Sequence, residues 1–191
     1  TNISFIVPLL KDYFPNCKII HVIRDGRDYV RSAYSKVIFP AKNGKPAMMF
    51  MTDEDHRRRL RATDLPGDPY RERWADMSRF QRLCWYWVTV NTIIEEAIGQ
   101  HPGITPGQDT LQVKYEDIFS PGAGGVAAIT DFLGLTGNMS AGPGEAEAFF
   151  NRKVNHTKKF LLPEWEEWAP EQKEFFEKIA RDKMDAYRYP F

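Results

Sequence analysis

The sequence is poor in cysteine, with two in 191 residues. Cys17 and Cys84 are too few for a disulfide framework, and their spacing does not match a metal-binding motif, so no metal is expected. We interpret both as small buried apolar side chains. The shortage of cysteine favours a reducing compartment and a cytoplasmic location.

Long apolar runs and an excess of one charge are also absent. No stretch reaches the roughly 18 apolar residues of a transmembrane helix, so no membrane span is expected in this chain. The 26 basic residues balance the 26 acidic ones, and without a global positive field we expect no nucleic-acid partner. An anion site must therefore be local. The length suits a single domain over residues 1–191.

The most informative segment is a short apolar run, Ile19–Ile23, that stops at the charged turn 24–28 before a helix-compatible stretch. Open α/β sheets bind ligands where strands end in this way. Arg24 would leave the strand tip, and Ser32 would lie on the second turn of the helix. An arginine fork and a hydroxyl near a helix N-terminus suit a phosphate monoester. An ordinary strand–helix junction, with its arginines paired to aspartates, is the alternative.

A second strand followed by a helix is predicted downstream. Leu111–Tyr115 predicts a strand, which Glu116, Asp117 and Ile118 follow, and Gly125–Leu133 predicts a helix closed by Gly134. Strands separated by long helices favour a parallel α/β sheet. Glu116 and Asp117 are predicted to be structural, because carboxylates often cap helices.

In this order, the two motifs resemble the PAPS-dependent sulfotransferases. The resemblance covers residues 14–135, and its matching positions are Phe14, Pro15, Lys18, Arg24, Asp25, Arg27, Asp28, Ser32, Tyr115, Glu116, Asp117, Phe132, Leu133 and Gly134. It implies a P-loop-NTPase-like sulfotransferase fold, with a central parallel sheet flanked by helices. It also implies 3′-phosphoadenosine 5′-phosphosulfate (PAPS) as co-substrate and a small-molecule or carbohydrate acceptor with a hydroxyl or amine.

The resemblance assigns roles to individual residues. Arg24 and Ser32 would bind the 3′-phosphate, while Asp25, Arg27 and Asp28 brace the turn. Tyr115 would approach the adenine, although a core tyrosine is an equal alternative. A basic loop would cover the 3′-phosphate, or simply be solvated; its cations are Arg152, Lys153, Lys158 and Lys159.

The chain departs from the family pattern in one respect. Nothing in it matches the N-terminal strand–loop–helix whose lysine grips the 5′-phosphosulfate, and the opening residues carry no general-base histidine. We therefore expect an N-terminally incomplete domain that is weak or inactive alone; a missing N-terminus could carry a Golgi anchor. The alternatives are a non-catalytic module that binds 3′,5′-adenosine diphosphate and an unrelated α/β phosphate-binding protein.

The remaining pattern predicts mostly helices. Expected helices cover residues 3–14, with a kink or late start at Pro8, and 27–36, 74–98, 125–133, 145–151 and 170–187, while residues 37–73 form an irregular, lid-like segment. Aromatic side chains on the 74–98 helix are expected in the core. The resemblance implies, as the alternative, that Trp87 and Asn91 lie beside an acceptor pocket. The basic cluster 56–61 is interpreted as a solvated face, with contact to an anionic acceptor as the second interpretation and nucleic-acid binding as the third.

Overall fold

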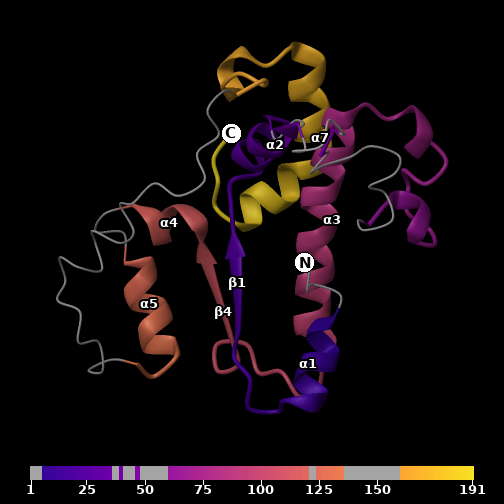
Figure 1. Ribbon diagram of the computed structural model, residues 1–191. Helices are drawn as coiled ribbons and strands as arrows, with labels where there is room; N and C mark the ends of the chain where they lie inside the picture. Colours follow the sequence, from indigo (N-terminus) through magenta and orange to yellow (C-terminus); the bar gives the residue numbers. More distant parts are fainter. Residues whose placement is uncertain (1–5, 36–38, 41–45, 48–59, 121–123, 136–159) are drawn as a thin grey trace. The chain divides into compact units, whose positions relative to one another are not determined.

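The computed structural model describes residues 6–35, 39–40, 46–47, 60–120, 124–135 and 160–191 (Figure 1). Its elements are α1 (Val7–Tyr13), β1 (Ile19–Ile23), α2 (Gly26–Ser35), β2 (Phe39–Pro40), β3 (Pro46–Ala47), η3 (Ala62–Asp64), η4 (Trp74–Asp76), α3 (Arg79–Gln100), β4 (Thr110–Lys114), α4 (Tyr115–Phe119), α5 (Gly125–Phe132), η5 (Trp165–Glu167) and α7 (Pro170–Ala186). The predicted helix 145–151 lies outside the described residues.

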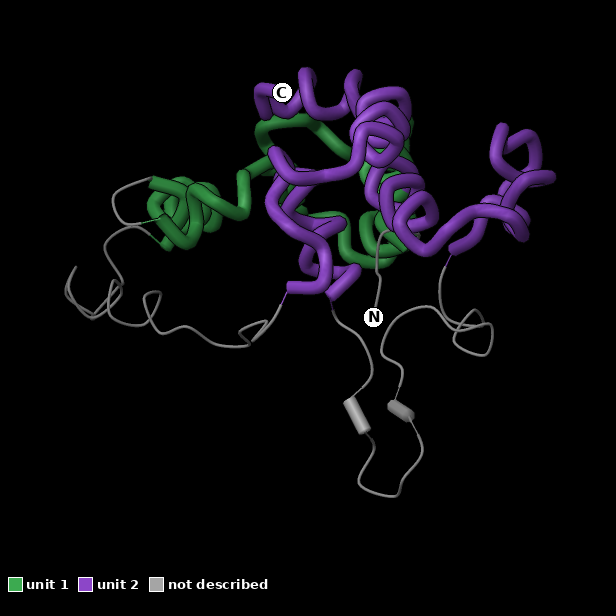
Figure 2. Tube along the Cα trace, turned by 90° about the horizontal axis from the view of Figure 1, so that it is seen from above, with its two compact units in different colours: residues 1–24, 90–156 green, residues 25–89, 157–191 purple. Residues whose placement is uncertain are grey.

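The chain divides into two compact units (Figure 2). Unit 1 contains residues 1–24 and 90–156, and unit 2 contains residues 25–89 and 157–191. The division passes through the turn after β1 and through the middle of α3, so both units draw on segments that are distant in the sequence.

Unit 1 is built on a parallel pair of strands, β1 and β4. Ile19 pairs with Thr110 and Ile23 with Lys114, so the two strands end together (Figure 1). Both strands are rich in β-branched residues, which fit a pleated surface. The prediction of an α/β chain, mostly helical and with a parallel strand pair, is confirmed at this level.

Helices α4 and α5 follow β4 in unit 1. A Cβ on Gly125 would lie 2.6 Å from the backbone carbonyl of Asp117, so only glycine lets α5 begin against α4. At the other end of α5, Gly134 has φ 70°. The Gly134 and Leu135 amides donate to the carbonyls of Asp131 and Thr130. This is a Schellman motif, and it explains why the predicted helix ends before Gly134.

A buried lysine ties α1 to the loop before β4. The Nζ of Lys11, a side chain only 4 % exposed, donates to Asp109 Oδ1 at 2.8 Å and to the Cys17 carbonyl at 3.3 Å. Asp109 also accepts the Thr105 amide at 2.8 Å. Pro8 lies in the first turn of α1, where its missing N–H costs nothing. The predicted late start of this helix agrees with that position.

Unit 2 has an aromatic core around α7. Phe176 is fully buried, and its ring contacts Trp87, Trp165 and Trp168 at centroid distances of 6.4, 5.6 and 5.6 Å. A Cβ on Gly26, at the start of α2, would meet Phe176 and Trp87 at 3.0–3.1 Å. The absence of a side chain at Gly26 therefore lets α2 pack closely on these rings.

A second cluster in unit 2 involves residues 60–77. Ala62, Trp74, Met77 and Trp85 are buried together, and the Trp85 indole donates to Asp68 Oδ2 at 2.9 Å. The described part of the predicted irregular segment 37–73 thus contributes side chains to a core. The rest of that segment lies outside the described residues, except for the strands β2 and β3.

The predicted continuous helix 74–98 is wrong in its start. Trp74–Asp76 forms a separate 3₁₀ turn, and Met77 is extended with ψ 132°. The Ser78 amide donates to Gln81 Oε1 at 2.8 Å and the Gln81 amide donates to Ser78 Oγ at 3.3 Å. This capping box starts α3 at Arg79. The helix then runs past Gly99 and ends at Gln100.

No helix in the described part of the chain is long and apolar enough to cross a membrane.

Candidate functional site

The carboxyl end of the strand pair in unit 1 brings together two residues that the sequence assigned to one site. Arg24 follows β1 directly, and Tyr115 follows β4. Because Ile23 pairs with Lys114, the next residues on both strands emerge at the same edge. The guanidinium carbon of Arg24 lies 5.0 Å from the centre of the Tyr115 ring, within the range of a cation–π contact.

Tyr115 presents its ring at the surface. It is 37 % exposed, so the alternative of a core tyrosine is wrong. Its ring lies 4.5 Å from that of Phe119, one helical turn later, at an interplanar angle of 39°. The sequence predicts Tyr115 as the last residue of a strand. In the structure it is the first residue of α4. The result is a cation over one face of a partly exposed aromatic pair.

The capping role predicted for the acidic residues after Tyr115 is not seen, because Lys114 occupies the N-cap of α4 and no side chain caps it. Glu116 and Asp117 lie in the first turn of α4, where negative charge is favourable against the helix dipole.

Ser32 belongs to unit 2, where it lies half-buried on the second turn of α2. Asp25 caps this helix: its Oδ1 accepts the Arg27 amide at 2.8 Å, and its carbonyl accepts the Tyr29 amide at 2.8 Å. The N-terminus of α2 is therefore fixed by a side chain of the charged turn.

Arg27 braces the same turn. Its Nε and Nη2 donate to the two carboxylate oxygens of Asp25 at 3.0 and 2.6 Å. This bidentate bond is the main reason why the pKa of Arg27 is raised, and burial opposes it. The prediction that Asp25 and Arg27 stabilise the turn is confirmed.

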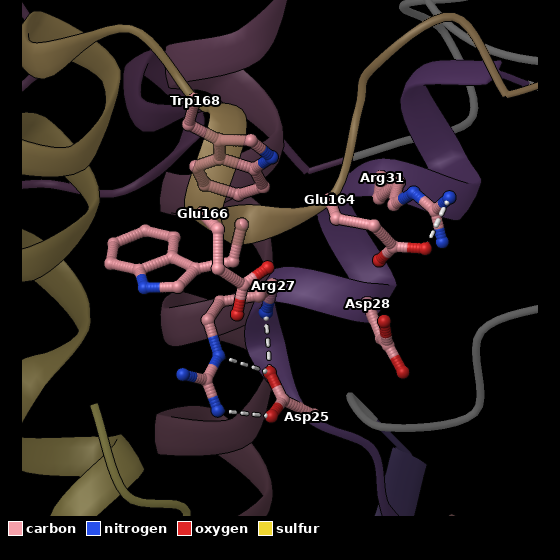
Figure 3. Close-up of a pocket in the computed structure, with 8 residues that line it drawn as sticks. Asp25, Arg27, Asp28, Arg31, Glu164, Glu166 and Trp168 are labelled. Atoms are coloured by element: carbon pink, nitrogen blue, oxygen red, sulfur yellow. Dashed lines mark hydrogen bonds and ion pairs between the residues drawn. The ribbon is translucent and has the colours of Figure 1, made fainter.

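Unit 2 also contains a polar cavity of about 210 Å³ beside α2 (Figure 3). Two ion pairs stand on its wall, Arg27 with Asp25 and Arg31 with Glu164 at 2.7 Å. The full lining is Asp25, Arg27, Asp28, Arg31, Glu164, Trp165, Glu166 and Trp168. Because carboxylates outnumber the guanidinium groups here, this cavity does not favour an anion.

Other sequence candidates have structural roles or lie elsewhere. Trp87 is 3 % exposed and packs in the core of unit 2, which confirms the core interpretation of that aromatic helix. In unit 1 the buried Asn91 makes a hydrogen bond with His21, with 2.9 Å between Oδ1 and Nε2. Burial raises the pKa of the Cys84 thiol well above its usual value. The thiol is thus inert, as expected of a core cysteine.

Several predicted residues lie outside the described part of the chain. They include every cation of the predicted phosphate-covering loop and most of the basic cluster 56–61; the loop cations are Arg152, Lys153, Lys158 and Lys159.

Sequence reasoning overlooked Phe119 and the segment 160–168. Phe119 stands four residues after Tyr115, a spacing that brings two rings together on a helix. In the segment 160–168 the signal is a pair of tryptophans, Trp165 and Trp168, which two glutamates separate and two prolines flank. Both features were visible in the sequence.

Comparison with protein-family models, with curated proteins and with solved structures finds no match to this chain. The chemistry of the site therefore depends on its own residues. A guanidinium group can bind phosphate oxygens in a fork, and an exposed aromatic face can stack on a base. The end of the β1–β4 pair combines these two groups.

Proposed function

We propose that this chain acts as a PAPS-dependent sulfotransferase, which transfers a sulfuryl group from PAPS to a hydroxyl or amine acceptor. The observation that supports this most is the contact of Arg24 with Tyr115 where β1 and β4 end. The two residues come from two separate motifs, and each motif resembles that family. A P-loop-like sulfotransferase fold with a larger central sheet is part of the same proposal.

The side chains suit the 3′,5′-diphosphate chemically. A 3′-phosphate is a compact dianion that a guanidinium binds through two parallel hydrogen bonds. Adenine has a flat π-face, and stacking on an aromatic side chain contributes about 1–3 kcal/mol per base. Arg24 would serve the phosphate, and Tyr115 the base. Ser32 on α2 would add a hydroxyl to the phosphate.

PAPS, when bound, would supply the sulfuryl group: the acceptor oxygen or nitrogen would bond to its sulfur in line as the bond from sulfur to the 5′-phosphate oxygen breaks, releasing 3′,5′-adenosine diphosphate. Negative charge then accumulates on the departing 5′-phosphate oxygen, and preorganised cations stabilise it. In this proposal Arg24 holds the nucleotide by its 3′-phosphate, so that the 5′ end is presented in one orientation. The general base that takes the acceptor's proton is not assigned to any described residue.

The test compares the affinities for 3′,5′-adenosine diphosphate and 5′-AMP by titration calorimetry. Wild type should prefer the 3′,5′-diphosphate, and Arg24→Ala should lose about 1.5–3 kcal/mol of that binding, the range for a hydrogen bond to a charged group. Arg73→Ala removes an exposed arginine in unit 2 and serves as the control. An unchanged affinity in Arg24→Ala would contradict the assignment.

Ser32→Ala gives a second, smaller test. Loss of one hydroxyl to a charged ligand should weaken 3′,5′-adenosine diphosphate by about 1–3 kcal/mol and leave 5′-AMP unaffected. Incubation with PAPS and a panel of phenols, sugars and amines then separates the enzyme from a binding module. Nucleotide binding without sulfated product in any reaction would favour the non-catalytic alternative.

A further inference from the structure

Residues 160–164, called the strap below, are held on α2 by two side chains of that helix. Arg31 Nε donates to the Leu162 carbonyl at 3.2 Å, and Arg31 Nη2 pairs with Glu164 at 2.7 Å. The Arg31 guanidinium also lies over the Phe160 ring, 3.8 Å from its centre. Ser35 Oγ accepts the Leu161 amide at 2.8 Å. Two helix residues thus contact four residues of the strap.

The contacts come from one face of α2. Positions 31 and 35 are one turn apart, so their side chains are neighbours on the helix surface. The hydroxyl of Ser35 completes the link by donating to the Arg31 carbonyl at 2.8 Å. Figure 3 shows the Arg31 guanidinium turned toward Glu164 of the strap. The strap is therefore fixed to the second and third turns of α2.

Burial shows which of these contacts are protected from water. The Arg31 side chain is 18 % exposed, whereas that of Glu164 is 59 % exposed. An ion pair with such an exposed partner is screened and contributes little. The hydrogen bond to the Leu162 carbonyl and the stacking on Phe160 are therefore the stronger parts of the link. These contacts hold the guanidinium of Arg31 against the strap.

Ser32 follows Arg31 directly, on the turn of α2 that the strap contacts. We infer that Arg31 is a positioning residue: together with Ser35 it docks the strap on α2 and so fixes the turn that presents Ser32 to a phosphate dianion. This inference rests on the proposed function, because that function makes Ser32 a ligand of the 3′-phosphate. A preorganised hydroxyl binds more tightly, since less motion is lost on binding.

The test uses Arg31→Met in the full chain, which keeps an unbranched apolar stem at position 31 and removes the polar contacts of Arg31 to the strap. Arg181→Met is the matched control. Arg181 on α7 also pairs with a glutamate, Glu177 at 2.6 Å, and also lies over a phenylalanine, Phe191 at 4.5 Å. Ser35→Ala is a milder variant that removes only the acceptor of the Leu161 amide.

Hydrogen exchange gives the first measurement. In Arg31→Met and in Ser35→Ala the Leu161 amide should exchange about tenfold faster, because local opening no longer breaks the same contacts. In Arg31→Met the α2 amides around Ser32 should also exchange faster. Arg181→Met should change neither the exchange of the Leu161 amide nor that of the α2 amides. Unaltered exchange in Arg31→Met, in protein that still melts cooperatively, would overturn the inference.

Binding of 3′,5′-adenosine diphosphate gives the second measurement. Arg31→Met should weaken it about three- to tenfold, and this loss should disappear in the Ser32→Ala background, as expected of residues that act through one another. Equal losses in both backgrounds would overturn the positioning role. If wild type binds no nucleotide, the proposed function and the role of Ser32 fail together. Hydrogen exchange alone then decides whether Arg31 docks the strap.

Discussion

The two units differ in how they bury apolar side chains. Among the described residues, most of the large, fully buried side chains belong to unit 2: Trp85, Phe176, Leu83, Met184, Val30 and Cys84, with Ile23 in unit 1. Most of the exposed large apolar side chains in the same part of the chain belong to unit 1, among them Tyr13, Phe14, Val22, Tyr115 and Phe119. Unit 2 is thus stabilised by an aromatic core, while unit 1 presents aromatic surface at the end of its sheet.

The same contrast separates the two arginines of the charged turn. Arg27, in unit 2, donates three hydrogen bonds to the carboxylate of Asp25, one from its backbone amide and two from its guanidinium. Arg24, in unit 1, is stacked on a ring that is more than one-third exposed. A carboxylate two residues away makes an arginine a structural brace. The guanidinium of Arg24 lies over the face of the Tyr115 ring, and this contact is the basis of the nucleotide site proposed above.

The largest effect is expected in the core of unit 2. Phe176→Ala should lower the free energy of unfolding by about 3–5 kcal/mol, because the ring is fully buried among three tryptophans. Phe119→Ala, which removes a ring that is 45 % exposed in unit 1, is the matched control. Urea unfolding of the two variants measures the contrast. Equal destabilisation by both would contradict the difference between the units.

A smaller loss is expected where unit 1 does pack closely. Gly125→Ala should destabilise by about 1–3 kcal/mol, since its Cβ would overlap the backbone of α4. Gly99→Ala is the control on α3, where an added Cβ meets nothing within 4 Å. There alanine should stabilise by about 0.5–1 kcal/mol through helix propensity. Thermal unfolding should therefore shift in opposite directions, and a shift in the same direction would be evidence against close packing at Gly125.

Local signals explain which elements could be predicted from the sequence. Strand β1 and helices α2, α5 and α7 lie within one or two residues of their predicted bounds, because a local signal marks at least one end of each. These signals are the charged turn between β1 and α2, Gly134 after α5 and Pro170 at the start of α7. The start of α3 was missed because apolar spacing continues through Trp74, while the capping box of Ser78 and Gln81 sets the boundary. A cap can therefore override a periodic pattern.

The candidate site was predictable only in part, for a physical reason. The sequence assigned Arg24 and Tyr115 to one nucleotide site without predicting their contact, which follows from parallel strands that end together. The strap could not be predicted, because its contacts are a backbone carbonyl, a backbone amide and a ring on a segment without periodic pattern. Such contacts depend on tertiary packing rather than on spacing.

The smallest effect concerns the pH dependence of unit 1. The hydrogen bond from Lys11, helped by the Thr105 amide, lowers the pKa of Asp109 below its ordinary value. A depressed pKa in the folded state stabilises the protein fully above the unfolded value of about 3.9, and this contribution is lost as the pH falls through the folded pKa.

Asp109→Asn should therefore be less stable than wild type at pH 6. The difference in stability should shrink as the pH falls below about 4, because the carboxylate of the unfolded chain takes up its proton before that of the folded chain. Melting curves between pH 3 and pH 6 measure this, with Asp182→Asn, an exposed carboxylate of α7, as the control in unit 2. A constant difference across that range would mean that Asp109 acts through shape alone. A difference that shrinks with acid would locate the acid sensitivity in the Lys11–Asp109 link of unit 1.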